Sequence, residues 1–356
     1  MDDKILILGG GYGGALAALR LARRGIAVTL VDARAALVER IRLHQVVAGD
    51  DVAPIAYSRL FRGLPIHFVQ ARVTAIDRER KIVQTTDGEL AYDQLVYALG
   101  SESVTPEHAV SVANPIAARG KVREAKHVAV VGGGLTGIEI ASEIAERHPH
   151  VDVTLVHSGK LGDDLGARAQ RHLREWMEKH NVTLLEETKV TSVSEEGVML
   201  DTGEHLYAGA VLWCGAFRLS DIARAAGLRV NERGQIIVDE QLRSSDPSIL
   251  AIGDAAARGH LRMSCATALP MGAYVADLLA GATKEPFRFA FAGRCISLGR
   301  HDGIYQMVSA DDTPRELAVT GRAGAWVKEM VCRYTALSLK LESRGVHYRW
   351  PKAEVV

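Results

Sequence analysis

The stretch ILILGGGYGG at residues 5–14 decides the fold of this chain. An apolar run at 5–8 leads directly into Gly9, Gly11 and Gly14, which have the spacing GxGxxG, and a segment of helical period follows at 14–24. The first glycine allows a tight turn, the second lets a pyrophosphate approach the backbone, and the third lets helix and strand pack closely. Free N–H groups at the start of the helix suit a phosphate. The stretch therefore predicts a strand, a phosphate cradle and a helix in succession.

Asp32 is placed to bind the ribose of a dinucleotide whose pyrophosphate lies on this turn. Asp32 follows the next apolar run, 27–31, about 20 residues beyond the glycines. A carboxylate in that place can accept both hydroxyl groups of an adenosine ribose. We therefore expect one dinucleotide to bind at Gly9, Gly11, Tyr12, Gly13, Gly14 and Asp32.

The same order of elements returns at residues 127–156, with a second GxGxxG motif in the stretch GGGLTG at 132–137. After the second strand of this unit the chain reads HSGK (157–160) and has no acid. NAD sites usually place an acid there, and NADP sites avoid one because it would repel the 2′-phosphate. This strand end favours NADPH and also allows NADH. We expect a nicotinamide dinucleotide on Gly132, Gly134, Leu135, Thr136 and Gly137, with His157 and Ser158 at its ribose.

Two cradles in one chain predict two cofactors that exchange electrons. A single GxGxxG is also found as an ordinary tight turn in an α/β core, but here both motifs are framed by a strand, a helix and a second strand. Two nicotinamides have nothing useful to exchange, so one of the two cofactors should be a flavin. We expect FAD together with NADH or NADPH.

The composition is typical of a globular protein and excludes several other classes. The chain has 356 residues, of which 47% are hydrophobic and 24% charged, as in ordinary globular proteins of two or three domains. Lys plus Arg and Asp plus Glu both number 43, which argues against a general nucleic-acid binder. The four cysteines lie far apart, and no apolar run is long enough to span a membrane. We expect no metal site, no room for a signal peptide before the first strand, and a reducing cytoplasm.

Three further segments carry a family resemblance: YDQLVYALG (92–100), AVLWCGAF (210–217) and ILAIGD (249–254). Together with the two glycine motifs they resemble the two-dinucleotide flavoprotein reductases of the pyridine nucleotide–disulfide oxidoreductase superfamily, over about residues 4–280. The resemblance implies FAD on the first cradle and NAD(P)H on the second. It adds Arg42, Val73, Ala98, Gly100, Gly253 and Asp254 to the FAD residues, and Glu139 and Gly215 to the NAD(P)H residues.

The fold class implied is α/β, with two Rossmann-like three-layer domains arranged as in glutathione reductase and a C-terminal segment. In such proteins the NAD domain is inserted into the FAD domain. We therefore expect the FAD-binding domain at 1–110 and 236–285, the NAD(P)H-binding domain at 111–235, and an interface segment at 286–356.

The branch within the superfamily follows from local stretches. The disulfide reductases carry CxxxxC after the Asp32 strand, whereas residues 38–45 read VERIRLHQ, so electrons cannot leave through a dithiol there. The stretches 42–49, 134–139 and 321–326 resemble type II NADH dehydrogenases. Residues 153–158 resemble the apoptosis-inducing-factor-like quinone reductases, which accept NADH or NADPH. Type II dehydrogenases usually have glutamines near the quinone head, and residues 266–272 (ATALPMG) lack them, which leaves the acceptor open.

Individual side chains keep two interpretations each. Glu139 is either a helix-start acid favoured by the helix dipole or a group that faces nicotinamide and flavin. His44 is either packed in the core or lies near the flavin and returns a proton to the acceptor. Arg42 pairs with an FAD phosphate or is a solvated surface charge. We name no certain catalytic residue, because hydride transfer between cofactors needs no protein nucleophile.

The tail has apolar residues at helical spacing between Ala325 and Leu341, with the basic residues Lys328, Arg333, Lys340 and Arg344 nearby. Such a helix lies on a membrane surface beside a lipid quinone, or it covers its own domain or a partner chain in a homodimer. We expect the second, because apolar stripes usually face a core.

The sequence as a whole predicts an FAD-dependent NAD(P)H:acceptor oxidoreductase whose acceptor is a quinone or a small molecule. One alternative is a reductase of a ferredoxin- or rubredoxin-type protein. Another is a redox-sensing binding protein that hardly turns over. The expected place is the cytoplasm, with the inner face of the membrane as the alternative.

Overall fold

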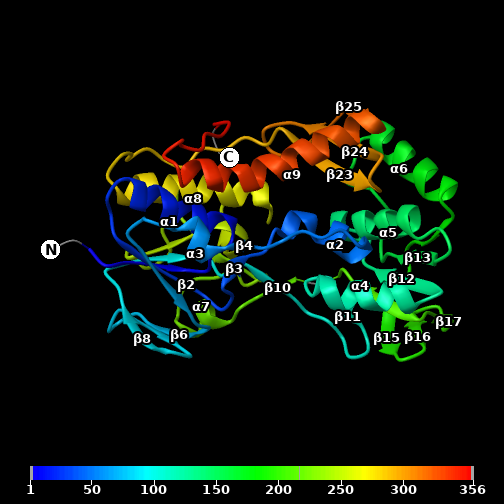
Figure 1. The fold of residues 1–356 in the computed structure, drawn as a ribbon, viewed down its shortest axis with the longest axis horizontal. Helices are drawn as coiled ribbons and strands as arrows, with labels where there is room; N and C mark the ends of the chain where they lie inside the picture. The colour runs from blue at the N-terminus through cyan, green and yellow to red at the C-terminus, as the bar shows by residue number, and fades with distance from the viewer. Residues whose placement is uncertain (1–2, 216, 354–356) are drawn as a thin grey trace.

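The computed structural model describes residues 3–215 and 217–353 and has two parallel five-stranded sheets (Figure 1). The first sheet carries the first cradle and has the order β21-β9-β1-β2-β5. Its strands are nearly continuous apolar runs, as is typical of a parallel sheet that is covered on both faces. The strands are β1 (Ile5–Leu8), β2 (Val28–Asp32), β5 (Ile66–Gln70), β9 (Gln94–Tyr97) and β21 (Ile249–Ala251).

The second sheet carries the second cradle and has the order β11-β18-β12-β13-β14, all parallel. Its strands are β11 (Val110–Ser111), β12 (His127–Val131), β13 (Asp152–Val156), β14 (Val182–Leu185) and β18 (Ala210–Trp213). The two Rossmann-like α/β units that the sequence predicts are therefore confirmed.

The second sheet is inserted into the first along the chain. The edge strand β21 of the first sheet follows all strands of the second sheet in the sequence. The outgoing and returning connections, β10 (Ser101–Ser103) and β19 (Phe217–Leu219), pair antiparallel with each other. This pairing ties the two units together next to the cradles. The domain boundaries given above remain predictions.

Helices cover the sheets, and smaller sheets complete the molecule. The helices are α1 (Tyr12–Arg23), α2 (Leu43–Ala48), α3 (Tyr57–Leu60), α4 (Pro115–Glu124), α5 (Leu135–Arg147), α6 (Ala167–Lys179), α7 (Ile222–Ala225), α8 (Cys265–Leu279) and α9 (Arg322–Glu342), with 3-10 turns at Arg40–Arg42 and Gly253–Ala255. The small strands are β3 (Ala36–Leu37), β4 (Ile55–Ala56), β6 (Val73–Asp77), β7 (Ile82–Thr85), β8 (Gly88–Ala91), β15 (Val190–Ser194), β16 (Gly197–Leu200), β17 (His205–Tyr207), β20 (Ile236–Ile237) and β22 (Ala256–Ala257).

The C-terminal part holds a feature that the sequence analysis missed. Strands β23 (Gly293–Leu298), β24 (Asp302–Val308) and β25 (Pro314–Thr320) form an antiparallel sheet, and α9 follows it. Helix α9 packs on α1 of the first unit and on β24, whose sheet packs on α5 and α6 of the second unit, so α9 extends from one unit to the other (Figure 1). Among the described residues, no helix is both long and apolar enough to span a bilayer.

Helix α9 is oriented opposite to our expectation. Its buried face includes Lys328, Thr335, Ser338 and Glu342 together with small and apolar residues. Its large apolar residues lie on the solvent side instead: Trp326 is 67% exposed, and Met330, Tyr334 and Leu337 are between 45% and 48% exposed. The apolar stripe therefore does not cover its own domain, because charged and hydroxyl side chains occupy that face, and its cover by a partner chain stays a prediction.

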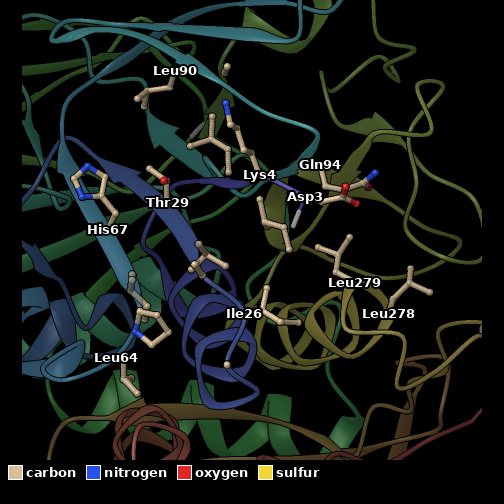
Figure 2. Close-up of a pocket in the computed structure, with 18 of the residues that line it drawn as sticks. Asp3, Lys4, Ile26, Thr29, Leu64, His67, Leu90, Gln94, Leu278 and Leu279 are labelled. Carbon is tan, nitrogen blue, oxygen red and sulfur yellow. The ribbon is translucent and has the colours of Figure 1, made fainter. Parts of the chain in front are cut away.

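A wide cavity of about 1150 Å³ lies at the amino ends of the first sheet (Figure 2). Lys4, Ile26, Thr29, His67 and Gln94 line it, from segments at or next to the starts of the strands. Ligands of open α/β sheets bind beyond the carboxyl ends of the strands, where both glycine motifs lie. The candidate site is therefore at the opposite edge of the sheet from this cavity.

Helices α1 and α8 approach each other at two glycines, which gives a test of the packing. A Cβ added to Gly272 of α8 would lie 2.2 Å from the carbonyl oxygen of Gly13 in α1. Gly272→Ala should therefore lower the free energy of unfolding by about 1–3 kcal/mol, because the helices must separate. Gly120→Ala in α4, whose new Cβ has no described atom within 4 Å, should raise it by about 0.5–1 kcal/mol. Urea denaturation of both variants measures this, and equal effects would contradict it.

Candidate functional site

The first cradle is built as its glycines predict. Gly9 has a φ of 100°, and a Cβ there would lie 2.4 Å from the carbonyl oxygen of Ala98. A Cβ on Gly14 would lie 1.9 Å from the carbonyl oxygen of Gly9. At Gly11, by contrast, a Cβ would meet none of the described atoms within 4 Å. The turn is therefore closed on the protein side and open where a pyrophosphate approaches the backbone.

The second cradle repeats this geometry. Gly132 has a φ of 110°, and a Cβ on Gly137 would lie 1.8 Å from the carbonyl oxygen of Gly132. Gly134 is open in the same way as Gly11, within the part of the chain that the structure describes. A Cβ on Gly132 would lie 2.8 Å from the backbone nitrogen of Gly215, so Gly215 closes the back of this turn.

The carboxylate of Asp32 is held in place at the end of β2. It accepts hydrogen bonds of 2.8 Å from the backbone N–H groups of Gly10 and Arg34. The hydroxyl of Tyr57 donates to the carbonyl oxygen of Gly10 at 2.8 Å and supports the same turn. Asp32 also lines a cavity of about 440 Å³, in which its remaining lone pairs can meet a ribose.

Two neighbouring cavities, of about 440 and 310 Å³, run from Asp32 to Asp254. Arg40, Gly100 and Ser101 line both, so they form one path of the size of a ligand site. The hydroxyl of Ser101 donates to Asp254 at 2.8 Å, which fixes that carboxylate at the far end. The predicted FAD residues that line this path are Gly9, Gly11, Tyr12, Gly13, Gly14, Asp32, Val73, Ala98, Gly100, Gly253 and Asp254. Backbone amides at one turn and two fixed carboxylates fit an extended FAD.

Arg42 lies outside this group. Its guanidinium donates to both carboxylate oxygens of Glu329 at 3.1 Å and to Gln45, away from the cradle. Arg40 lies in the path instead, donates to the carbonyl oxygen of Ser101 at 3.0 Å, and stands 6.0 Å from the ring centre of Phe217. Sequence reasoning missed Arg40, because two arginines in one short turn do not reveal which of them faces the cavity.

The second cradle meets the first at the 310 Å³ cavity, which we call the flavin cavity. Thr136 from the second motif and Phe217 from the returning connection line it beside Gly11 and Asp254. Ala216 lies outside the described residues. At the end of β13, His157 accepts a hydrogen bond from Gly133 N–H through Nδ1 at 3.3 Å, and the next residue, Ser158, is exposed. The second cradle therefore opens toward the place where the flavin ring fits.

Comparisons with known proteins agree with this geometry. A family model described as pyridine nucleotide-disulphide oxidoreductase matches residues 3–276. A type II NADH:quinone oxidoreductase of Staphylococcus haemolyticus is 27% identical over 92% of this chain and 94% of that protein. Ferroptosis suppressor protein 1 of Xenopus tropicalis is 27% identical over 85% of this chain and 88% of its own. The structure of NDH2 from Plasmodium falciparum in complex with NADH has a TM-score of 0.81 at 17% identity and covers 97% of both chains.

The chain belongs to the pyridine nucleotide-disulphide oxidoreductase family. This confirms the expected superfamily and an enzyme that is an FAD-dependent NAD(P)H oxidoreductase. The disulphide of the family name has no counterpart after β2, because residues 33–49 contain no cysteine. Cys214, Cys265, Cys295 and Cys332 are all free thiols.

Next to the flavin cavity, this family member has a buried ion pair. Glu139 lies one turn after Thr136 in α5, and its Oε1 is 2.6 Å from Nζ of Lys328 in α9. Ser297 N–H donates to the same oxygen at 3.0 Å. Burial acts to raise the pKa of Glu139 and to lower that of Lys328. Their mutual attraction, together with the hydrogen bonds to Glu139 and the other charged neighbours, outweighs burial and shifts both pKa values the other way. Both groups are therefore charged at neutral pH.

His44 is brought to this pair by α2. Its Nδ1 lies 3.5 Å from Oε2 of Glu139. Burial lowers the pKa of His44 to about 4, so the ring is neutral at pH 7. The sequence analysis had singled out His44 and Glu139 separately and did not predict their contact. It noted Lys328 only as a basic residue in the tail, because nothing in an amphipathic pattern shows that a lysine lies on the buried face.

The ion pair gives a test of the site. Lys328→Met should lower the free energy of unfolding by about 3–5 kcal/mol, because it leaves the charge of Glu139 buried without a partner. The double variant Lys328→Met, Glu139→Gln should recover most of that loss, and Lys340→Met on the exposed side of α9 should change little. Thermal and urea unfolding at pH 7 measure these differences. A Lys328 variant as stable as the Lys340 variant would show that the pair is not buried in solution.

Proposed function

We propose that this oxidoreductase passes electrons from NAD(P)H through FAD to a quinone. The observation that carries the proposal is the flavin cavity, where Thr136 of the second cradle and Gly11 of the first line the same space. When bound, FAD supplies the two-electron chemistry between the nicotinamide and the acceptor. Gly11, Asp32, Arg40 and Asp254 would hold it, and Gly134 would hold the pyrophosphate of NAD(P)H.

The acceptor would meet the flavin directly. The helix region after β2 has no dithiol to carry electrons onward, and Ile41, Ile252 and Met263 give the flavin cavity apolar walls that suit a quinone ring. The relative from Staphylococcus haemolyticus is named a type II NADH:quinone oxidoreductase, which supports this choice. A ferredoxin- or rubredoxin-type acceptor and a sensing role remain the alternatives.

The exposed stripe of α9 supports a lipid-soluble quinone. Trp326, Met330, Tyr334 and Leu337 lie on one side of the helix, and the basic residues Arg333 and Lys340 are exposed beside them. An amphipathic helix of this kind binds at a membrane surface without crossing it. We infer peripheral contact with the inner face of the membrane as the place where the enzyme meets its acceptor.

The nicotinamide site favours NADPH in this proposal. His157 and Ser158 stand at the end of β13, and Lys160 is exposed close by. The nearby acid, Glu186, is bound by Arg174 at 2.7 and 2.8 Å, which lowers the pKa of Glu186 to about 2 and balances its charge. Arg174 therefore neutralises Glu186 at this strand end, and the positive charge of Lys160 suits a 2′-phosphate.

Glycine variants test the two cofactor sites separately. Gly11 and Gly134 have φ values of −60° and −70°, and a side chain would enter open space at both, so Gly11→Leu and Gly134→Leu should fold. Gly11→Leu should purify without the visible absorption of flavin. Gly134→Leu should keep the flavin and raise the Kd of NADPH about tenfold or more, which corresponds to about 1.4 kcal/mol.

The acceptor is tested with the wild-type protein. The protein is reconstituted with FAD and reduced anaerobically by NADPH or NADH. A short-chain ubiquinone or menaquinone analogue should then reoxidise the flavin fast enough to support steady-state turnover. Reoxidation by ferredoxin or rubredoxin and not by quinones would support the first alternative. Protein that stays colourless after reconstitution would end the proposal.

A charge change at residue 157 tests the coenzyme preference. His157→Glu should raise the KM for NADPH about tenfold relative to that for NADH, because a carboxylate repels the 2′-phosphate. His67→Glu, an equal charge change on β5 at the far edge of the first sheet, is the control and should leave the ratio unchanged. Steady-state kinetics with both coenzymes decide between these outcomes, and an unchanged ratio in both variants would refute this preference.

A further inference from the structure

Glu143 is a buried acid that the site described so far does not use. Its side chain is 1% exposed, and neither carboxylate oxygen has a hydrogen-bond partner among the described residues. It lies one turn after Glu139 on the same side of α5. A buried polar group without a partner is rare and costly, so its presence calls for a physical reason.

Charged and titratable groups from several elements face Glu143. Nε2 of His44 in α2 is 3.8 Å from Oε1, and Nη1 of Arg300, in the turn between β23 and β24, is 3.6 Å from the same oxygen. Three carboxylates also act on it: Asp50, Glu139 and Glu146. Burial raises the pKa of Glu143 to about 7, and the carboxylates act in the same direction, whereas Arg300 opposes them. Glu143 therefore gains and loses its proton near neutral pH.

His44 connects Glu143 to Glu139. The ring lies between the two carboxyl groups, with Nδ1 at 3.5 Å from Glu139 and Nε2 at 3.8 Å from Glu143. If the one proton of the neutral ring is on Nδ1, it faces the charged Glu139, and Nε2 can accept a proton from Glu143 or from the hydroxyl of Ser297 at 3.3 Å. Both carboxyl contacts are longer than a hydrogen bond, and such contacts tighten in a reacting complex.

The two ends of this row reach solvent and the flavin. At one end, Arg300 and Ser297 line a cavity of about 250 Å³, which has room for several water molecules and which Lys328 also lines. At the other end, Glu139 contacts Lys328. Burial raises the pKa of the nearby Cys265 thiol, and the charge of Lys328 opposes this shift. Cys265 lines the flavin cavity. The row therefore lies between this cavity and the flavin cavity.

Quinone reduction needs a proton from such a path. A quinone takes up two electrons and two protons to become a quinol, whereas NAD(P)H, when it is oxidised to NAD(P)⁺, supplies two electrons and one proton. The second proton comes from water. We propose that Glu143 and His44 relay this proton from the cavity beside Arg300 to the Glu139–Lys328 pair, an inference that rests on the proposed quinone reduction. A proton leaves Oε1 of Glu143 for Nε2 as the proton on Nδ1 leaves for Glu139. Glu139 then gives up its proton to the reduced quinone, and water reprotonates Glu143.

The relay makes the reaction depend on pH in one direction. Below pH 7 Glu143 holds its proton and can deliver it, and above pH 7 it is ionised and the supply falls. The kcat for quinone reduction should therefore decrease as the pH rises through about 7. Ferricyanide accepts electrons without protons, so its reduction by the same enzyme should not show this decrease.

The variant Glu143→Gln tests the relay in the FAD-loaded enzyme. We expect kcat with a short-chain quinone to fall at least tenfold and to lose its dependence on pH near 7, while ferricyanide reduction stays within twofold of the wild type. Glu143→Asp, which keeps a titratable group, should restore part of the rate and the pH dependence. Glu146→Gln removes a neighbouring carboxylate that raises the pKa of Glu143, so it should move the decrease in kcat to lower pH without abolishing it.

A second measurement does not depend on turnover. A carboxyl group whose pKa is raised in the folded protein contributes stability at low pH that is lost as the pH rises from its ordinary value of 4.5 through about 7. The Tm of the wild type, relative to that of Glu143→Gln, should therefore fall between pH 5 and pH 8.

The outcomes separate the relay from the function on which it rests. A wild type that reduces ferricyanide but no quinone would refute the acceptor, and the Tm profile would still decide whether Glu143 exchanges a proton in this range. A flat difference in Tm overturns the relay. So does a Glu143→Gln enzyme that keeps the wild-type pH profile with quinone, or one that loses quinone and ferricyanide reduction equally.

Discussion

Both halves of this protein depend on backbone that no side chain covers. A pyrophosphate can reach the amides at the start of a helix only if the second glycine of the turn leaves that space open, and Gly11 and Gly134 both do so. The other two glycines of each motif have the opposite task. At Gly14 and Gly137 a Cβ would overlap the carbonyl oxygen that begins the same turn, at 1.9 and 1.8 Å. One tight turn, used twice, therefore sets where both cofactors would lie.

The position of one cradle relative to the other comes from long-range contacts. The antiparallel pair β10–β19 joins the two connections, and Ser101 of β10 and Phe217 of β19 both line the flavin cavity. Helix α9 then joins the two units from the other side, with Lys328 against Glu139. Neither contact lies within a glycine motif. The chemistry at the flavin cavity thus depends on the connection between the units and on the C-terminal helix as much as on the cradles.

The contrast between local glycine motifs and long-range contacts explains which features could be predicted from the sequence. The cradles, both parallel sheets and the residues along the FAD path could be predicted, because strand, glycine turn and helix follow one another within about 30 residues. Arg40 was missed in favour of Arg42, because the direction of a side chain in a short 3-10 turn depends on what packs against it. The sheet β23–β25 was missed altogether, and Lys328 was noted only as a charge, because their roles exist only once α9 packs across the two units.

The inverted arrangement of α9 connects the two proposals. A helix that only covers a core would place Trp326 and Met330 inward and Lys328 outward, since burying charge costs more than burying apolar surface gains. Here Lys328 and Glu342 are inside, and the large side chains of Trp326, Met330, Tyr334 and Leu337 are outside. A buried ion pair is weak evidence for stability, so the cost of placing Lys328 next to Glu139 is better explained by a need for charge beside the flavin. The exposed stripe costs little if an apolar phase that holds the quinone covers it, and both faces of the helix then serve the same reaction.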